Sequence, residues 1–357
     1  MSEIPIKGVK FSIKEKCLSL EFEGKYQALS SAVLNGGFRK VKAIVNYQVD
    51  KDFSNRNPKA FLRKVLISFP KPIVGLMTAA DITKYALKYS IQKNFSVCTI
   101  VTAGISNAVS VGENSTQPYL GTINIIVLID GRLSKSCMVN LIETVTEAKS
   151  MALIDLDVRS KFSGELASST TTDAIALACT GRGETINYAG TGTNLGIATG
   201  KIVREAVKEA IQKQHSFYSN RPLINRLEER GVTLDHIIDV IFKRYPELKC
   251  FSKEEVKKFI ENSLKNAEIS LLTIAGLRIE EDYLRGLIPK MDKTINLELI
   301  DKIFGLHIAK IVNEDYGVKE FLNLRKNELK TLNLGLFSKS VIKGLLAGVL
   351  SKLKSCK

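Results

Sequence analysis

The sequence predicts a mixed α/β domain, built on a mixed sheet with helices, followed by an all-α domain. The first 215 residues contain several β-branched runs that are bounded by Gly or Pro, as strands are. From Pro222 to the end, apolar residues recur at three- and four-residue spacing, which is the helical period. The pattern changes from strand-like runs to helical spacing within the polar segment HSFYSNRP, residues 215–222. We therefore expect an α/β domain over residues 1–215 and an all-helical domain over residues 222–357.

The first domain alternates predicted strands with predicted helices. The strands are VKAIVNYQV (41–49), IVGLM (73–77), VCTIVTAG (97–104) and TINIIVLID (122–130). Before them, apolar and polar residues alternate in VKFSIKEKCLSLEFEG (9–24), which predicts a β-hairpin with one solvent-exposed face. Helical spacing predicts helices over residues 58–68, 134–156 and 195–214.

The second domain carries helix signals with few interruptions. FSKEEVKKFIENSLKNA (251–267) has Ser252 followed three residues later by Glu255, which predicts a capping box. LELIDKIFGLHIAKIV (297–312) has an apolar face at helical spacing. The helical pattern is interrupted at Gly231, Gly286 and Gly317.

Composition narrows the class of protein. The chain has 357 residues, 45% of them hydrophobic and 25% charged, as folded two-domain proteins have. The net charge is +15, but the lysines are scattered and no nucleic-acid module is recognisable, so a solvated basic surface is favoured over nucleic-acid binding. The longest apolar runs are strand-sized, so no membrane partner is expected and the predicted location is cytoplasmic.

Histidine and cysteine usage excludes several kinds of catalytic site. The three histidines are His215, His236 and His307, so the body of the first domain has none. A Ser-His-Asp or Cys-His nucleophile and the usual zinc hydrolase all need imidazole. The six cysteines form no CxxC or Cys/His cluster, which predicts neither a disulfide framework nor a structural zinc site. Hydrolysis here has to use carboxylates, hydroxyls, lysine, amides or backbone N–H groups.

Polar clusters interrupt the apolar strands of the first domain. They are TAGISNA (102–108), GTIN (121–124), ETVTEAK (143–149), SSTTTDA (168–174) and YAGTGTNLG (188–196). Loops of this kind supply donors for an anion or a developing oxyanion. Each also has a structural interpretation: Thr and Asn bond locally at strand ends, Asp173 can cap a helix, and Glu143 and Glu147 can face water. The clusters alone indicate an α/β hydrolase or a ligand-binding domain.

The same clusters, in the same order, resemble the adenosylcobinamide amidohydrolase family. The resemblance rests on LSSAVLNGGFR, VGLMTAAD, TAGISNA, GTINIIVLIDGRLS, TEAKSMAL, STTTDAIALACTGRG and YAGTGTNLG, and it covers most of residues 20–213. It implies corrinoid salvage: hydrolysis of the amide that joins a corrin-ring propionate to aminopropanol, which turns adenosylcobinamide into adenosylcobyric acid. No cofactor is evident in this domain.

The second half resembles the helical phosphatidylglycerophosphatase A-like family. The matching stretches are LINRLEERGVTLDHIIDVIF, AGLRIEEDYLRGLIP and IKGLLAGVLSKL. An archaeal branch of that family acts on α-ribazole phosphate, so the fusion implies a bifunctional enzyme with α-ribazole phosphate as its second substrate. The resemblance also implies Mg²⁺ held by Asp235, Glu280 and Asp301. Ser340 and Val341 replace an expected acidic pair, and the loop around Arg325 lacks its acid, which leaves an inactive helical scaffold as the alternative.

Roles within the first domain follow as hypotheses. Glu147 is the general base on water, Lys149 or a threonine hydroxyl is the proton donor, and Asp173 orients the polar loop or is the alternative base. Glu147 and Lys149 lie two residues apart, so an ideal helix does not place them on one face. A covalent route through Thr171 or Thr172 is the second mechanism, although it lacks an obvious base.

Substrate contacts are predicted from hydroxyl and amide side chains, which suit a corrin ring that is rimmed with amides. The predicted contacts are Thr102, Asn107, Thr122, Asn124, Thr171, Thr191 and Asn194. A corrinoid-binding protein without hydrolytic activity remains the non-enzyme alternative, and an oligomer is compatible with the sequence.

Overall fold

The computed structural model describes residues 4–114, 121–288, 297–324 and 335–355. The chain divides into two compact units, residues 1–220 and 221–357. The first is a mixed α/β unit and the second is made of helices, so the predicted fold class is confirmed. No helix among the described residues has the length and apolar character needed to cross a membrane.

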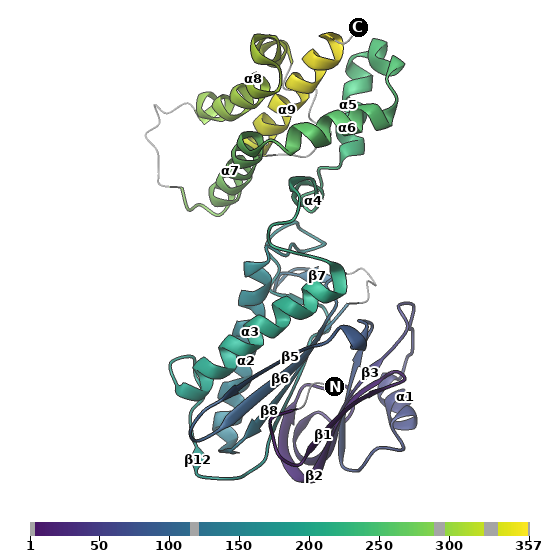
Figure 1. Ribbon diagram of the computed structural model, residues 1–357, viewed down its shortest axis with the longest axis vertical. Helices are drawn as coiled ribbons and strands as arrows, with labels where there is room; N and C mark the ends of the chain where they lie inside the picture. The colour runs from purple at the N-terminus through teal and green to yellow at the C-terminus, as the bar shows by residue number, and fades with distance from the viewer. Residues whose placement is uncertain (1–3, 115–120, 289–296, 325–334, 356–357) are drawn as a thin grey trace. The chain divides into compact units, whose positions relative to one another are not determined.

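The first unit is built on an eight-stranded mixed sheet (Figure 1). Its strand order is β4 (Ile73–Thr78), β3 (Gly37–Gln48), β2 (Cys17–Ser30), β11 (Ala174–Cys179), β8 (Ile123–Asp130), β6 (Ser96–Ala103) and β5 (Ala86–Ile91), with β1 (Val9–Lys14) pairing to β2. β8 and β6 are buried along nearly their whole length, as their continuous apolar runs predict.

The sheet folds back on itself. The β2–β3 ladder shifts register between Glu21 and Tyr26, where such an irregularity bends the strands. As a result, apolar side chains of β2, β3 and β4 share one core with those of β6, β8 and β11. The fold-back is what brings β3 and β4 to the end of β8, although they are not its neighbours in the sheet.

Helices cover the two outer faces. α2 (Lys135–Asp155) and α3 (Asn194–His215) pack on β5, β6 and β8 through a large apolar cluster, and α1 (Pro58–Val65) covers the outer side of β3 and β4 (Figure 1). Ser134 caps α2 and Thr193 caps α3, each through a side chain that accepts a backbone N–H of the first turn. Short pairs complete the unit: β7 (Ala108–Val109) with β10 (Ser169–Thr170), and β9 (Arg132–Leu133) with β12 (Thr185–Ile186).

The second unit has its own apolar core. Its helices are α4 (Leu223–Glu228), α5 (Leu234–Arg244), α6 (Lys253–Leu264), α7 (Ala267–Leu284), α8 (Leu297–Asn323) and α9 (Leu336–Ser355). The predicted capping box of Ser252 and Glu255 is present at the start of α6. α8 and α9 approach so closely that a Cβ on Gly344 would lie 2.2 Å from the carbonyl oxygen of Gly305. Only glycine permits that packing.

Candidate active site

Three chain segments meet at one end of the folded sheet: residues 104–107 after β6, residues 121–124 at the start of β8, and residues 170–173 before β11. Gly104 donates its N–H to the carbonyl of Thr122 at 2.9 Å. The short β7–β10 ladder pairs Ala108 with Thr170, which holds the first segment beside the third. Polar residues that are separated in the sequence therefore gather at one edge of an apolar core.

A buried amide and hydroxyl network lies beneath these segments. Asn124 donates to the side-chain oxygen of Asn46 and to the carbonyl of Met77, at 2.8 and 2.7 Å. Asn46 in turn donates to the hydroxyl of Thr102 at 2.8 Å. Asn46, Thr102 and Asn124 are each at most 2% exposed. Thr102 and Asn124 were predicted site residues; Asn46 was not, although one asparagine inside the β-branched run VKAIVNYQV was a usable signal.

Asp173 and Lys149 form a buried ion pair with 2.5 Å between Nζ and Oδ2, and their side chains are 10% and 7% exposed. The Asp173 carboxylate also accepts the N–H of Ile123 at 3.0 Å, the N–H of Thr170 at 3.1 Å and the hydroxyl of Thr170. Four donors therefore share one carboxylate. The Asp173 oxygens are therefore already occupied by groups of the protein, which favours an orienting role for Asp173.

The remaining hydroxyls tie the segments together. Thr122 donates to the carbonyl of Thr172 at 2.7 Å, and Thr172 donates to the carbonyl of Gly121 at 2.8 Å. Asn107 donates to the hydroxyl of Thr171 at 2.5 Å. A Cβ on Gly121 would lie 2.3 Å from the side-chain oxygen of Asn107, so only glycine fits there. We call this set the strand-end cluster: Asn46, Thr102, Asn107, Thr122, Asn124, Lys149, Thr170, Thr171, Thr172 and Asp173.

His215 reaches the same end of the sheet from the last turn of α3. Its Nε2 accepts the N–H of Ile105 at 3.1 Å, which requires that nitrogen to be unprotonated. His215 is exposed as a residue, but partial desolvation of its ring lowers its pKa, and the charges of Lys161, Lys84 and Lys51 lower it further. The sequence carries no signal for a site role of His215, because its contact, Ile105, lies 110 residues away along the chain.

The predicted residues Glu147, Thr191 and Asn194 lie away from the strand-end cluster. Glu147 and Asn194 are exposed, and Glu147 and Thr191 line a groove of about 470 Å³ between α2 and α3. Lys149, two residues after Glu147, is buried on the other side of α2. We call this hollow the helix groove. The structure therefore divides the predicted site residues between two places.

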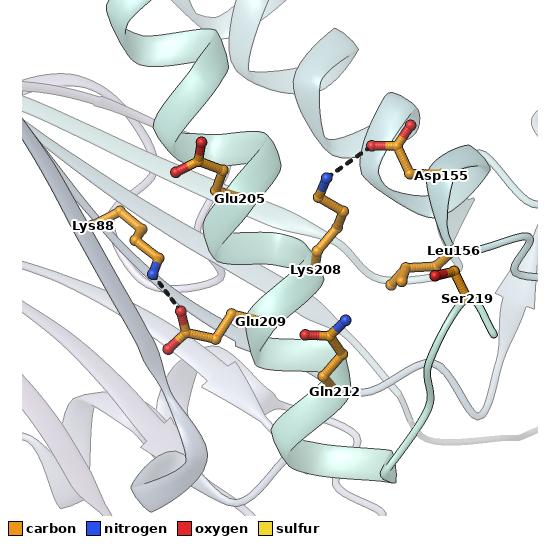
Figure 2. A pocket seen from close by; sticks show the side chains of 8 residues that line it. All are labelled: Lys88, Asp155, Leu156, Glu205, Lys208, Glu209, Gln212 and Ser219. Carbon is orange, nitrogen blue, oxygen red and sulfur yellow. Dashed lines mark ion pairs between the residues drawn. The ribbon is translucent and has the colours of Figure 1, made fainter. Parts of the chain in front are cut away.

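A further hollow of about 390 Å³ lies between α3, the end of α2 and β5, and Figure 2 shows its charged lining. Its charges are paired across it, with Lys88 at 2.5 Å from Glu209 and Lys208 at 3.1 Å from Asp155 (Figure 2). None of the predicted site residues lines it.

Buried cysteines of the first unit do not supply a nucleophile. Desolvation raises the pKa of Cys98 to about 12 and that of Cys137 to about 11, so both stay thiols at neutral pH. The thiolate is the attacking form of cysteine.

In the second unit, the residues predicted to hold Mg²⁺ are placed differently from one another. Glu280 is 7% exposed, and its carboxylate accepts the N–H groups of Phe337 and Ser338 at 2.7 and 3.3 Å, at the start of α9. Asp235 is exposed in the first turn of α5, and the side chain of Asp301 lies outside the described residues. Over the described part of the chain, no three His, Cys, Asp or Glu side chains gather as a metal site requires. The contacts of Glu280 are those of a helix cap, and the described residues around it do not fit a Mg²⁺ site.

Residues 3–219, which contain the whole strand-end cluster, match the family described as adenosylcobinamide amidohydrolase. The chain belongs to this family. An adenosylcobinamide amidohydrolase from Methanosarcina mazei is 31% identical over 215 residues, which are 57% of this chain and 96% of that protein. An uncharacterized protein of Methanocaldococcus jannaschii is 30% identical over 225 residues, which are 56% of this chain and 87% of that protein.

Membership in the adenosylcobinamide amidohydrolase family makes the chain a hydrolase of corrinoid salvage. Among solved structures, the β-aminopeptidase of Burkholderia sp. has a TM-score of 0.32 and 11% identity, over 60% of this chain and 86% of that one. That likeness is too low to carry an argument. The assignment therefore rests on the sequence family.

Proposed function

We propose that the first unit hydrolyses the amide bond of adenosylcobinamide at the strand-end cluster and releases adenosylcobyric acid and aminopropanol. The observation that supports this is the convergence of ten polar side chains at one end of an apolar sheet, around the Lys149–Asp173 pair. Buried polar groups are tolerated when they are hydrogen-bonded. Here they bond to one another and hold the Thr171–Thr172 turn in one geometry, as a site that binds and polarises amides requires.

In this proposal, water adds to the amide carbon, the carbon–nitrogen bond breaks, and a proton passes to the departing amine. Lys149 is the proposed proton donor, since its ammonium is held by Asp173 at the edge of the exposed Thr171–Thr172 turn. Asp173 is the proposed orienting group, because its oxygens already accept four hydrogen bonds. Asn46, Thr102 and Asn124 form a buried hydrogen-bonded network at the same end of the sheet.

Glu147 as general base is the alternative, and it places the chemistry in the helix groove. Glu147 is exposed there, beside Thr191 and Lys201. The corrin ring is large enough for the groove to bind part of it while the reaction occurs elsewhere. The two assignments therefore give opposite expectations for one substitution, Glu147→Gln.

The test uses the full chain, adenosylcobinamide under multiple-turnover conditions, and mass detection of both products. Lys149→Arg keeps the buried positive charge but cannot give up its proton, so kcat is expected to fall by about 10²–10⁴-fold. The denaturation midpoint of each variant shows whether the fold survives. Glu147→Gln, the matched surface change on the same helix, is expected to keep full turnover.

Three results would contradict parts of this proposal. Full turnover by Lys149→Arg would remove the proton-donor role, and loss of turnover in Glu147→Gln alone would move the chemistry to the helix groove. Retention of intact adenosylcobinamide without any product would leave a corrinoid-binding protein as the function.

The α-ribazole phosphate phosphatase activity of the second unit stays a separate proposal, and it rests on the sequence resemblance alone. Incubation with α-ribazole phosphate and Mg²⁺ tests it, because free α-ribazole is the expected product. Without that product, the second unit is a helical scaffold.

A further inference from the structure

The five hydroxyls of residues 168–172 are not equivalent. Thr170 donates its proton to Asp173, and Thr172 donates its proton to the carbonyl of Gly121. Ser168 accepts the N–H of Val111 at 2.9 Å. Thr171 accepts from Asn107, and no protein acceptor for its own proton is found among the described residues. Thr170 and Thr172 thus hold the turn in place, while the hydroxyl protons of Ser168, Ser169 and Thr171 have no protein acceptor among the described residues. Of these three residues, Thr171 is the exposed one, and Ser168 and Ser169 are half-buried.

Thr171 also lies at the surface, as Thr172 does. The residue is exposed, whereas Asn107 beneath it is completely buried. Asn107 directly precedes Ala108 and Thr171 directly follows Thr170, and Ala108 and Thr170 are register partners, so Asn107 and Thr171 stand opposite each other at the end of the β7–β10 ladder. Because the Asn107 amide donates to the Thr171 oxygen, the Thr171 proton does not point at Asn107 and is available to a bound group.

Stability does not explain asparagine at position 107. Its side-chain oxygen is buried and has no hydrogen-bond partner in the described part of the chain. A buried acceptor without a partner lowers the stability of the folded state. A residue that lowers stability and acts on one exposed hydroxyl is typical of a functional position.

We propose that the Thr171 hydroxyl donates a hydrogen bond to the carbonyl oxygen of the scissile amide, and that Asn107 is the positioning residue that turns this proton outward. The inference rests on the proposed function and deepens it. Thr171 is separated by one residue from Asp173, which holds Lys149. The turn thus presents one donor to the carbonyl oxygen, where negative charge develops, near a second donor to the departing nitrogen.

The experiment compares the full chain with three variants on adenosylcobinamide. Thr171→Val removes the hydroxyl at nearly constant shape, and we expect kcat to fall by about 10²–10³-fold while KM stays close to that of the parent, as for the loss of a donor that acts in the transition state. Thr171→Ser keeps the hydroxyl and is expected to retain most of kcat. Thr146→Val is the comparison variant, because Thr146 lies on the exposed side of α2 and its hydroxyl donates to the carbonyl of Ile142 within that helix, so kcat is expected to stay that of the parent.

Asn107 is tested by a double-mutant cycle. Asn107→Leu alone is expected to lower kcat less than Thr171→Val does, because the hydroxyl remains but is no longer oriented. In the Thr171→Val background, Asn107→Leu is expected to cause no further loss in kcat, since residues that act through one another are non-additive. Denaturation midpoints accompany every variant, and a purely structural role for Asn107 would instead give additive losses that follow those midpoints.

The outcomes separate this inference from the proposed function. An active parent whose Thr171→Val variant keeps its kcat overturns the inference and leaves the proposed function standing. A trapped acyl-enzyme on Thr171 overturns the donor role in favour of covalent attack. A parent that forms no adenosylcobyric acid overturns the proposed function, and the inference with it.

Discussion

Asp173 shows at the residue scale how a buried charge organises this protein. Its carboxylate joins α2, the start of β8 and the turn before β11 through Lys149, Ile123 and Thr170. Breaking such a buried pair by removing one partner typically costs about 3–5 kcal/mol, because the other charge is left alone in a poorly solvating place. The pair therefore fixes the geometry of the Thr171–Thr172 turn, and any change at Lys149 needs a measurement of stability beside that of rate.

His215 gives the prediction at this scale, which is a dependence of stability on pH. Partial desolvation of its ring and the neighbouring charges of Lys161, Lys84 and Lys51 lower its pKa in the folded protein. Unprotonated His215 accepts the N–H of Ile105, so its contribution to stability is complete above the unfolded pKa of about 6.5. We expect that contribution to be lost as the pH falls from there toward the folded pKa.

The measurement compares the free energy of unfolding of the parent with that of His215→Gln between pH 7.5 and pH 5. Glutamine offers an acceptor that does not titrate, so the difference between the two proteins is expected to change through the acid range. A constant difference would mean that His215 does not control the loop at Ile105.

At the scale of elements, a single glutamate starts the last helix. Glu280 on α7 accepts the N–H groups of Phe337 and Ser338, which are unsatisfied donors at the start of α9, and its negative charge faces the positive end of the helix. The sequence resemblance marked the same residue as a ligand of Mg²⁺. A cap and a metal ligand respond differently to substitution and to metal.

If Glu280 acts as the cap, Glu280→Gln lowers the stability of the second unit by about 0.3–2 kcal/mol, because the charge is lost and one acceptor remains. That loss is expected to be the same in EDTA and in Mg²⁺, as followed by chemical denaturation. A parent that gains stability in Mg²⁺ while the variant does not would establish Glu280 as a ligand, since a bound ion stabilises the folded state.

At the scale of the whole molecule, each unit carries its own core, and the strand-end cluster lies wholly in the first. Residues 3–219 also contain the full match to the amidohydrolase family. We expect residues 1–220, produced alone, to unfold cooperatively and to hydrolyse adenosylcobinamide with the kcat and KM of the full chain. A truncated protein that is folded but inactive would show that the helical unit takes part in the reaction.

The sequence alone determined the fold class and the positions of the main strands and helices. Long β-branched runs such as TINIIVLID can be satisfied only in a buried sheet, and capping residues such as Ser252 lie next to the helices that they start. Such signals are local, so a single chain reveals them. The family also followed from local blocks, because each polar cluster is contiguous in the sequence.

The way the polar residues combine follows from the packing of distant segments, which a single sequence does not reveal. The fold-back of the sheet brings Asn46 to Asn124, and the end of α3 brings His215 to Ile105; neither contact has a signal along the chain. Helix geometry separates Glu147 from Lys149, although they are near neighbours in sequence, because two residues span about 200° of an ideal helix. The hydrogen bonds of Thr171 and Thr172 depend on partners more than 50 residues away, Asn107 and Gly121, and those partners meet only when the core is packed.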